Sequence, residues 1–223
     1  MGKAKATRGD RAGAATTADK IRAAAEELFC LRGFEAVSVA DVAERAGVNK
    51  ALVFYHFESK AHLFDLVLAR YYDAHTAALA GAFADEGALA ERLHRVVDAY
   101  LDFMADNRRY AALVQQQLTE PGTHARIRRH LEPLLRFLEQ ALAGATPPKG
   151  PLAGRQFFVT FSGMVTHYFT YAPLLGALWG GDPMSRAALD ERRAHVHWLV
   201  DAILARLADE RPAKARPARA RTR

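Results

Sequence analysis

The sequence predicts an all-α protein, and three observations lead to this prediction. Alanine is abundant across the 223 residues, whereas proline and glycine gather in short segments between longer stretches that lack them. Apolar residues recur at i, i+3, i+4 and i+7 in one stretch after another. A Ser or Thr followed three residues later by Asp opens the first two stretches, which is the capping pattern of a helix start. Since 50% of the residues are hydrophobic, the chain can bury a sizeable core, in one domain or in a small domain joined to a larger one.

The first predicted helix begins after Thr16, which can form a capping box with Asp19. Gly33 ends this helix, because glycine readily adopts the left-handed conformation that stops a helix, and Phe34 packs back as the apolar partner of that cap. The inward face consists of Ile21, Ala25, Leu28 and Phe29.

A second helix is predicted to open at Ser38, with Asp41 completing another capping box. Gly47 supplies a tight turn, Val48 closes the corner against the core, and Asn49 is a good N-cap for a third helix. The apolar face before the turn consists of Val39, Val42, Ala43 and Ala46. Two helices joined by a glycine turn predict a helix-turn-helix, whose second helix is presented to the major groove of DNA.

The third helix divides into a buried side and a polar side. Leu52 and Phe57 fit the buried side. The residues with no evident inward task, able to donate hydrogen bonds to bases or phosphates, are Asn49, Lys50, Tyr55 and His56. The alternative for His56 is a place in the core, because it adjoins Phe57.

Five short motifs follow one another between residues 31 and 60. They are Leu31-Arg32-Gly33-Phe34, Val39-Ala40-Asp41-Val42-Ala43, Ala46-Gly47-Val48, Tyr55-His56-Phe57 and Ser59-Lys60. Through them residues 17–68 resemble the DNA-binding domain of the tetracycline-repressor (TetR) family of bacterial regulators. The sequence departs from the family pattern at Ala51, where glycine is frequent, and at Phe54, where a tyrosine often touches phosphate. Phe54 has no hydroxyl, so Tyr55 is expected to make that contact alone.

The resemblance implies sequence-specific binding of duplex DNA by residues 38–60. The residues expected nearest the bases are Asn49, Lys50, Ala51 and Tyr55, and those expected on phosphates are Ser38, Tyr55, His56 and Lys60. A cation in the first turn of a helix is poorly placed for the helix dipole, so a phosphate would explain the charge of Lys60. The alternative from another class is a ligand-carrying or interaction protein that does not bind specific DNA.

Six further helices are predicted after Ser59. The fourth is capped by Ser59 and runs to about Phe83, with Leu63, Phe64, Val67, Leu68 and Tyr71 inward. The fifth runs from about Leu89 to Met104, and the sixth is capped by Asn107 and ends near Leu118. The seventh carries Ile127 to Leu142, with Pro133 as a kink or as its true start. The eighth covers residues 152–171, broken by Pro173 and Gly176, and the ninth runs from residue 185 or 186 to about 207.

The positive charge is concentrated at the two ends of the chain. The net charge is +6, of which residues 1–16 carry +3 and residues 209–223 carry +4, which leaves about −1 for the rest. Both ends lack apolar periodicity and are predicted to be disordered basic segments. They flank a predicted DNA-binding domain at 17–62 and a helical ligand-binding and dimerisation domain at 63–208.

Two features bear on the compartment. The single cysteine, Cys30, cannot form an intrachain disulfide, and residues 1–16 lack the apolar centre of a signal peptide, so a cytoplasmic protein is expected.

Residues between Arg155 and Asp182 carry no formal charge over a length that spans a bilayer. Polar residues recur within this stretch, so a helix buried by its neighbours and by a partner subunit explains it better than a membrane span, and no membrane partner is expected.

The sequence lacks the motifs of common catalytic and cofactor sites. It contains no HExxH pair, P-loop, glycine-rich nucleotide fingerprint or GxSxG elbow. His195 and His197 lie two apart on a predicted helix and point to different sides, so they cannot share a metal ion. We therefore expect neither an enzyme nor a bound cofactor or metal.

Aromatic residues in the larger domain suggest a cavity for a hydrophobic small molecule, although an ordinary core is the alternative. The candidate lining residues are Phe103, Tyr110, Phe137, Phe158, Phe161, Met164, Tyr168 and Tyr171, with Thr166, His167 and Thr170 as polar groups. The resemblance implies a repressor that such a ligand releases from its operator. It also implies a homodimer formed by residues 152–171 and 185–207, which presents two recognition helices to a near-palindromic site.

Overall fold

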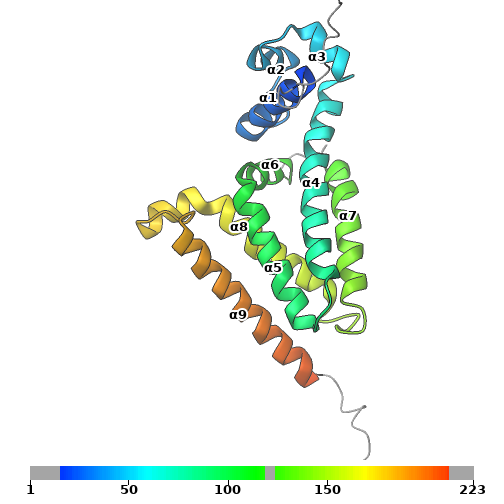
Figure 1. Cartoon of the computed structure of the whole chain (residues 1–223), viewed down its shortest axis with the longest axis vertical. Coiled ribbons are helices and arrows are strands. Elements are labelled where there is room, and N and C mark those ends of the chain that lie inside the picture. The colour runs from blue at the N-terminus through cyan, green and yellow to red at the C-terminus, as the bar shows by residue number, and fades with distance from the viewer. Residues whose placement is uncertain (1–15, 119–123, 211–223) are drawn as a thin grey trace, which may run out of the picture. The chain divides into compact units, whose positions relative to one another are not determined.

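The computed structural model describes residues 16–118 and 124–210, and over these residues the fold is all-α (Figure 1). In chain order the helices are α1 (Thr17–Arg32), α2 (Val39–Ala46), α3 (Lys50–His56), α4 (Lys60–Ala84), α5 (Leu89–Asp106), α6 (Arg108–Leu118), α7 (His124–Ala141), α8 (Gly154–Trp179) and α9 (Arg186–Glu210). Two compact units divide between Leu68 and Ala69, inside α4, where the sequence predicted a boundary after residue 62. The predicted basic end segments lie outside the described residues, apart from the cap Thr16 and the last two residues of α9.

The first unit contains α1, α2, α3 and the start of α4. Both predicted capping boxes are present: the Asp19 backbone N–H donates to Thr16 Oγ1 at 3.2 Å, and the Asp41 backbone N–H donates to Ser38 Oγ at 3.1 Å. In return, the Thr16 hydroxyl donates to Asp19 Oδ2 at 2.7 Å and the Ser38 backbone N–H donates to Asp41 Oδ2 at 2.7 Å. The hydrogen bonds that the two carboxylates accept from Thr16 and Ser38 lower the pKa of both aspartates. An aromatic cluster forms the centre of the unit, where the Phe29 and Phe64 rings meet edge to face at 5.0 Å. The fully buried side chains around it include Ile21, Val37, Val42, Val53, Leu63 and Leu68.

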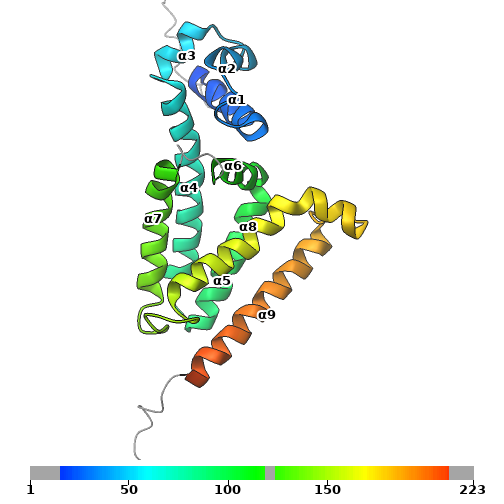
Figure 2. The ribbon, with the colours of Figure 1, turned by 180° about the vertical axis from the view of Figure 1, so that it is seen from behind.

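Helices of the second unit cover part of α8. α8 packs against α5, α6 and α7, and α9 packs along α5 (Figure 2). α8 buries Val165, Tyr168, Phe169 and Ala172, whereas Val159, Leu174, Leu178 and Trp179 of the same helix are exposed. In the described part of the chain, none of the helices combines the length and apolar character needed to cross a membrane.

The predicted end of the eighth helix is wrong. α8 continues through Pro173 and Gly176 to Trp179, and Gly180 ends it in the left-handed conformation at φ 71°. A proline in a helix removes a single backbone hydrogen bond, and here Phe169 and Ala172 are buried on the same helix, so packing outweighs the local preference.

The structure narrows two other local predictions, the role of Pro133 in the seventh helix and that of Asn107 at the start of the sixth. Pro133 lies within α7, nine residues after His124, so it does not mark the start of that helix. The Asn107 side chain donates from Nδ2 to the Phe103 carbonyl oxygen at 2.8 Å, so its amide serves the end of α5.

A polar network joins α9 to α5. Arg193 donates to Asp98 at 2.6 Å and also bonds Asp102, while His197 Nε2 lies 2.8 Å from Asp98. Burial alone would raise the pKa of Asp98, but the hydrogen bonds from Arg193 and His197 outweigh it and lower that pKa. His197 thus faces α5, whereas His195 is exposed and stacks on Trp198, which confirms that the two histidines point to different sides.

Candidate DNA-binding surface and ligand cavity

Helix α3 is fixed at both ends and along its inner side. Asn49 Oδ1 accepts the Leu52 backbone N–H at 2.8 Å, and the Phe57 backbone N–H donates to the Val53 carbonyl oxygen at 2.8 Å. Val53 is 2% exposed and Phe57 is 4% exposed, whereas Leu52 is half-buried. The sequence analysis did not identify Val53 as the deepest residue of the helix, although its position four residues before Phe57, on the same helix face, was a usable signal.

The outer side of α3 carries the side chains that the sequence predicted to face DNA. Lys50, Ala51, Tyr55 and His56 are all exposed, and 81% of Tyr55 is accessible. The Tyr55 and His56 rings meet edge to face at 5.1 Å. His56 is therefore not a core residue. Phe54 also lies on this side, with the Lys50 ammonium 5.9 Å from the centre of its ring.

Two residues predicted to contact DNA cap helices with their side-chain oxygens, and each still has a side-chain hydrogen that can be donated. Asn49 uses its side-chain oxygen in the cap, which leaves the NH₂ group to donate. The Ser38 hydroxyl oxygen accepts from Asp41, which leaves the hydroxyl hydrogen to donate. Both residues are exposed, so each can bond an external acceptor without breaking its cap.

Lys60 has a structural partner that the sequence did not indicate. Its ammonium donates to the Phe34 carbonyl oxygen at 2.9 Å and lies 4.2 Å from the centre of the Phe34 ring. Phe34 follows the C-terminal end of α1, where a cation is favoured by the dipole of that helix. An ammonium group has three donors, so this contact leaves Lys60 able to bond a phosphate as well.

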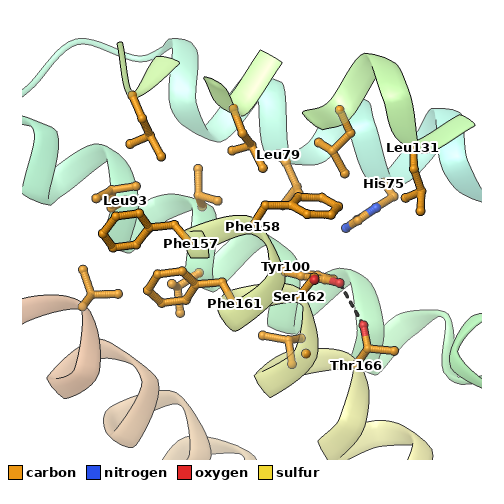
Figure 3. Close-up of a pocket in the computed structure, with 18 of the residues that line it drawn as sticks. His75, Leu79, Leu93, Tyr100, Leu131, Phe157, Phe158, Phe161, Ser162 and Thr166 are labelled. Atoms are coloured by element: carbon orange, nitrogen blue, oxygen red, sulfur yellow. Dashed lines mark hydrogen bonds between the residues drawn. The ribbon is translucent and has the colours of Figure 1, made fainter. Parts of the chain in front are cut away.

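The second unit encloses a cavity of about 440 Å³, within the range of small-molecule sites. Helices α4 to α9 all contribute to its wall, and no Asp, Glu, Lys or Arg is part of it. Figure 3 shows Phe157, Phe158 and Phe161 of α8 on one side, with Leu79 and His75 of α4 facing them. The remaining wall is mostly aliphatic, from Leu89, Leu93, Val96, Leu131, Leu134, Leu138 and Leu142.

The structure brings some of the predicted ligand residues together and separates others. Those on the cavity wall are Tyr110, Phe158, Phe161, Thr166, His167, Thr170 and Tyr171. Phe103, Phe137, Met164 and Tyr168 are not part of the wall. Phe137 packs edge to face on Phe83 at 5.8 Å, and the Tyr168 hydroxyl donates to the Pro183 carbonyl oxygen at 2.7 Å. Phe103 packs on Tyr110, and the Met164 carbonyl oxygen accepts from Arg192.

Polar groups of the cavity were partly missed from the sequence. The Tyr100 hydroxyl and Thr166 Oγ1 are 2.9 Å apart, and burial raises the pKa of Tyr100 to about 12. His75 is 3% exposed, and burial lowers its pKa to about 4, so its ring is neutral at pH 7. His75 lies at helical spacing with Leu68, Tyr72 and Leu79, and this pattern in the sequence could have indicated that it is buried. The described residues contain no cluster of three or more side chains suited to a metal ion.

These features define a class of protein in which a helix-turn-helix domain is joined to a helical unit with an apolar cavity. Residues 21–67 match the family described as bacterial regulatory proteins, tetR family. The matched residues lie in the first unit and include its helix-turn-helix.

Comparisons with individual proteins agree with this match. The HTH-type transcriptional activator FasR of Mycolicibacterium smegmatis is 33% identical over 107 residues, which are 47% of this chain and 49% of FasR. The match thus spans about half the length of that relative. The TetR family transcriptional regulator PfmR from Thermus thermophilus aligns with a TM-score of 0.58 and 26% identity, over 84% of this chain and 96% of PfmR. FadR from Bacillus subtilis, in complex with stearoyl-CoA, aligns with a TM-score of 0.61 and 17% identity, over 84% of this chain and 96% of FadR, and shows the same fold.

Proposed function

We propose that this protein is a transcriptional repressor that binds an operator as a homodimer and releases it when a hydrophobic small molecule enters the cavity. The observation that carries the proposal is the outer side of α3, where exposed polar and aromatic side chains stand on a helix fixed by buried Val53 and Phe57. FasR is named as an activator, so regulation in either direction occurs among similar proteins, and a reporter gene assay decides the direction here.

The contacts with DNA are assigned by exposure and, except for Ala51, by donor chemistry. Asn49, Lys50, Ala51 and Tyr55 of the α3 region reach base edges. Ser38, Tyr55, His56 and Lys60 bond phosphates, which position the helix without reading sequence.

A dimer is supported by large apolar side chains that are exposed on α8 and α9. Leu178 is 69% exposed, Trp179 is 64% exposed and Trp198 is 63% exposed, and Val159 and Leu174 are also accessible. Exposed groups of this size indicate an interaction surface. Since one seven-residue recognition helix contacts few base pairs, two copies are needed for tight and specific binding. Trp198→Glu is expected to shift the sedimentation coefficient from that of a dimer to that of a monomer at micromolar concentration, and an unchanged dimer would contradict the choice of this surface.

The effect of the ligand is assigned to α4. This helix begins with Lys60 and also carries Tyr72, His75 and Leu79 of the cavity wall. A ligand that favours the form unable to bind DNA by about 5.5 kcal/mol moves the population from 1:99 to 99:1. The apolar wall suits a hydrophobic ligand. FadR, which has a similar fold, binds stearoyl-CoA, a molecule with a long hydrocarbon chain.

The proposed function is tested by selecting bound fragments from random duplex DNA and measuring their affinity by mobility shift. We expect one near-palindromic sequence to bind about 10³-fold or more tightly than random duplexes. Asn49→Ala should relax the preference at one base pair, while Lys149→Ala, in an exposed loop of the second unit, should not. Equal affinity for all duplexes would favour the alternative, a ligand-carrying protein without an operator.

A further inference from the structure

His75 is a polar group on an otherwise apolar part of the cavity wall. Its ring lies 4.6 Å from the ring of Tyr100, 5.0 Å from that of Phe103 and 5.8 Å from that of Tyr110, measured between centroids. In Figure 3 the ring points from α4 into the space between α4 and α8. His75 is almost entirely buried, since only 3% of it is exposed, and it is part of the cavity wall.

Neither nitrogen of this ring is satisfied within the described part of the protein. Both Nδ1 and Nε2 are buried and have no hydrogen-bond partner there. Nearly all buried polar groups in folded proteins are hydrogen-bonded, because an unpaired one destabilises the fold. A phenylalanine would fill the same space among these aromatic rings without that penalty. The presence of histidine is explained if a group outside the chain completes the hydrogen bonds.

The neighbouring hydroxyls offer fewer unpaired polar atoms than His75. Tyr100 and Thr166 bond each other at 2.9 Å. The Tyr72 hydroxyl oxygen is also buried without a hydrogen-bond partner in the described protein, but it is a single polar atom, whereas His75 has two. Among these residues, His75 alone has two buried polar atoms, one donor and one acceptor, with no partner in the described protein.

The chemistry of the wall restricts the partner of His75. No charged side chain lines the cavity, so a buried carboxylate or ammonium would have no counter-ion. Burial also lowers the pKa of His75 to about 4, so the ring does not supply a positive charge at neutral pH. A neutral imidazole has one N–H donor and one nitrogen acceptor, and a hydroxyl group can bond either of them.

We propose that the ligand is an uncharged, largely hydrocarbon alcohol or phenol whose hydroxyl pairs with His75 while its apolar body packs on the phenylalanines and leucines of the cavity. The inference rests on the proposed ligand-binding function and specifies the chemical class that this site takes. The hydroxyl gives orientation and selectivity, and the hydrocarbon body gives most of the affinity.

The test compares three probes of nearly equal shape by calorimetry on the full-length protein. They are para-phenylphenol, para-methylbiphenyl and para-phenylbenzoate, which carry a hydroxyl, a methyl and a carboxylate on the same rigid body. We expect the phenol to bind about 5- to 10-fold more tightly than the methyl compound, as one satisfied hydrogen bond predicts. The carboxylate should bind most weakly at pH 7.

Two variants separate hydrogen bonding from shape. In His75→Phe the preference for the phenol over the methyl compound should vanish while the methyl compound binds at least as well as before. The same variant without ligand should melt at a higher temperature than the native protein, because it removes unpaired buried nitrogens. His75→Gln keeps a donor and an acceptor and should retain part of the preference.

The outcomes distinguish this inference from the function it rests on. Failure of all three probes to bind would overturn the ligand-binding function and this inference together. Binding with an equal preference for the phenol in the native protein and in His75→Phe would overturn only the role of His75. Tightest binding of the carboxylate would overturn the uncharged class of ligand.

Discussion

Lys60 offers the sharpest test of the DNA-binding surface. Its contacts with Phe34 predict an effect on stability, and its proposed phosphate contact predicts an effect on DNA affinity. Its ammonium bonds the Phe34 carbonyl oxygen at 2.9 Å and lies over the Phe34 ring, and the proposed function adds a phosphate contact. Lys60→Met keeps the aliphatic part of the side chain and removes the charge.

The expected loss of stability follows from the two contacts with Phe34. A hydrogen bond from a charged group contributes about 1.5 to 3 kcal/mol, and a partly exposed cation over an aromatic ring adds about 0.5 to 1 kcal/mol. Since Lys60 is half-buried, the lower values apply, and the first unit should lose about 2 kcal/mol. Amide hydrogen exchange of α1, α2 and α3 measures this loss in the first unit alone.

The expected effect on DNA binding is seen in its salt dependence. Each lost phosphate contact lowers the slope of log affinity against log salt by about 0.9, so a dimer with two Lys60 residues should lose about 1.8. Fluorescence anisotropy with a labelled operator at several salt concentrations gives the slope. Lys149→Met, which removes an exposed charge from a loop of the second unit, is the matched control and should leave the slope unchanged. An unchanged slope in Lys60→Met, with the expected loss of stability, would refute the phosphate contact.

Three further predictions concern the turn, the cap and the buried histidine. Gly47→Ala should destabilise the first unit by about 1 kcal/mol, measured by the same hydrogen exchange, because φ is +68° there although an added Cβ meets no atom; Gly47→Asn should cost less. Asn49→Ala should remove about 1 kcal/mol of capping energy in urea titrations and relax operator preference at one base pair by about 1 to 3 kcal/mol. Burial lowers the pKa of His75 in the folded protein from 6.5 to about 4, so folding favours the neutral ring. The contribution of His75 to the free energy of unfolding is therefore fully present above pH 6.5. Stability should fall by about 3 kcal/mol as the pH drops from 6.5 toward 4, and His75→Phe should remove this part of the pH dependence in urea titrations.

The first unit could be predicted closely because its signals are local. Capping boxes join residues three apart, and Gly47 adopts the left-handed conformation that its turn requires. The end of α8 could not be predicted in this way. Pro173 and Gly176 disfavour a helix by themselves, yet burial of Phe169 and Ala172 by distant segments maintains it.

The cavity was predicted only in part, since a sequence pattern does not separate a cavity wall from a packed core. Phe161 and Tyr171 line the cavity, whereas Phe137, predicted alongside them, packs on Phe83 instead. Tyr168 bonds the Pro183 carbonyl oxygen, fifteen residues away, and no local pattern indicates that contact. His75 lies at a helical spacing typical of a core residue, and its importance became evident only with its unpaired nitrogens.

The construction of α3 has a consequence for how such a protein can diverge after gene duplication. The helix is held by the Asn49 cap and by Val53 and Phe57, while Lys50, Ala51 and Tyr55 stand in solvent and add little to the fold. Exposed positions usually tolerate substitution within about 0.5 kcal/mol of stability. A duplicate copy can therefore exchange these residues one at a time and acquire a new target sequence, while the folded domain that carries them persists through every intermediate.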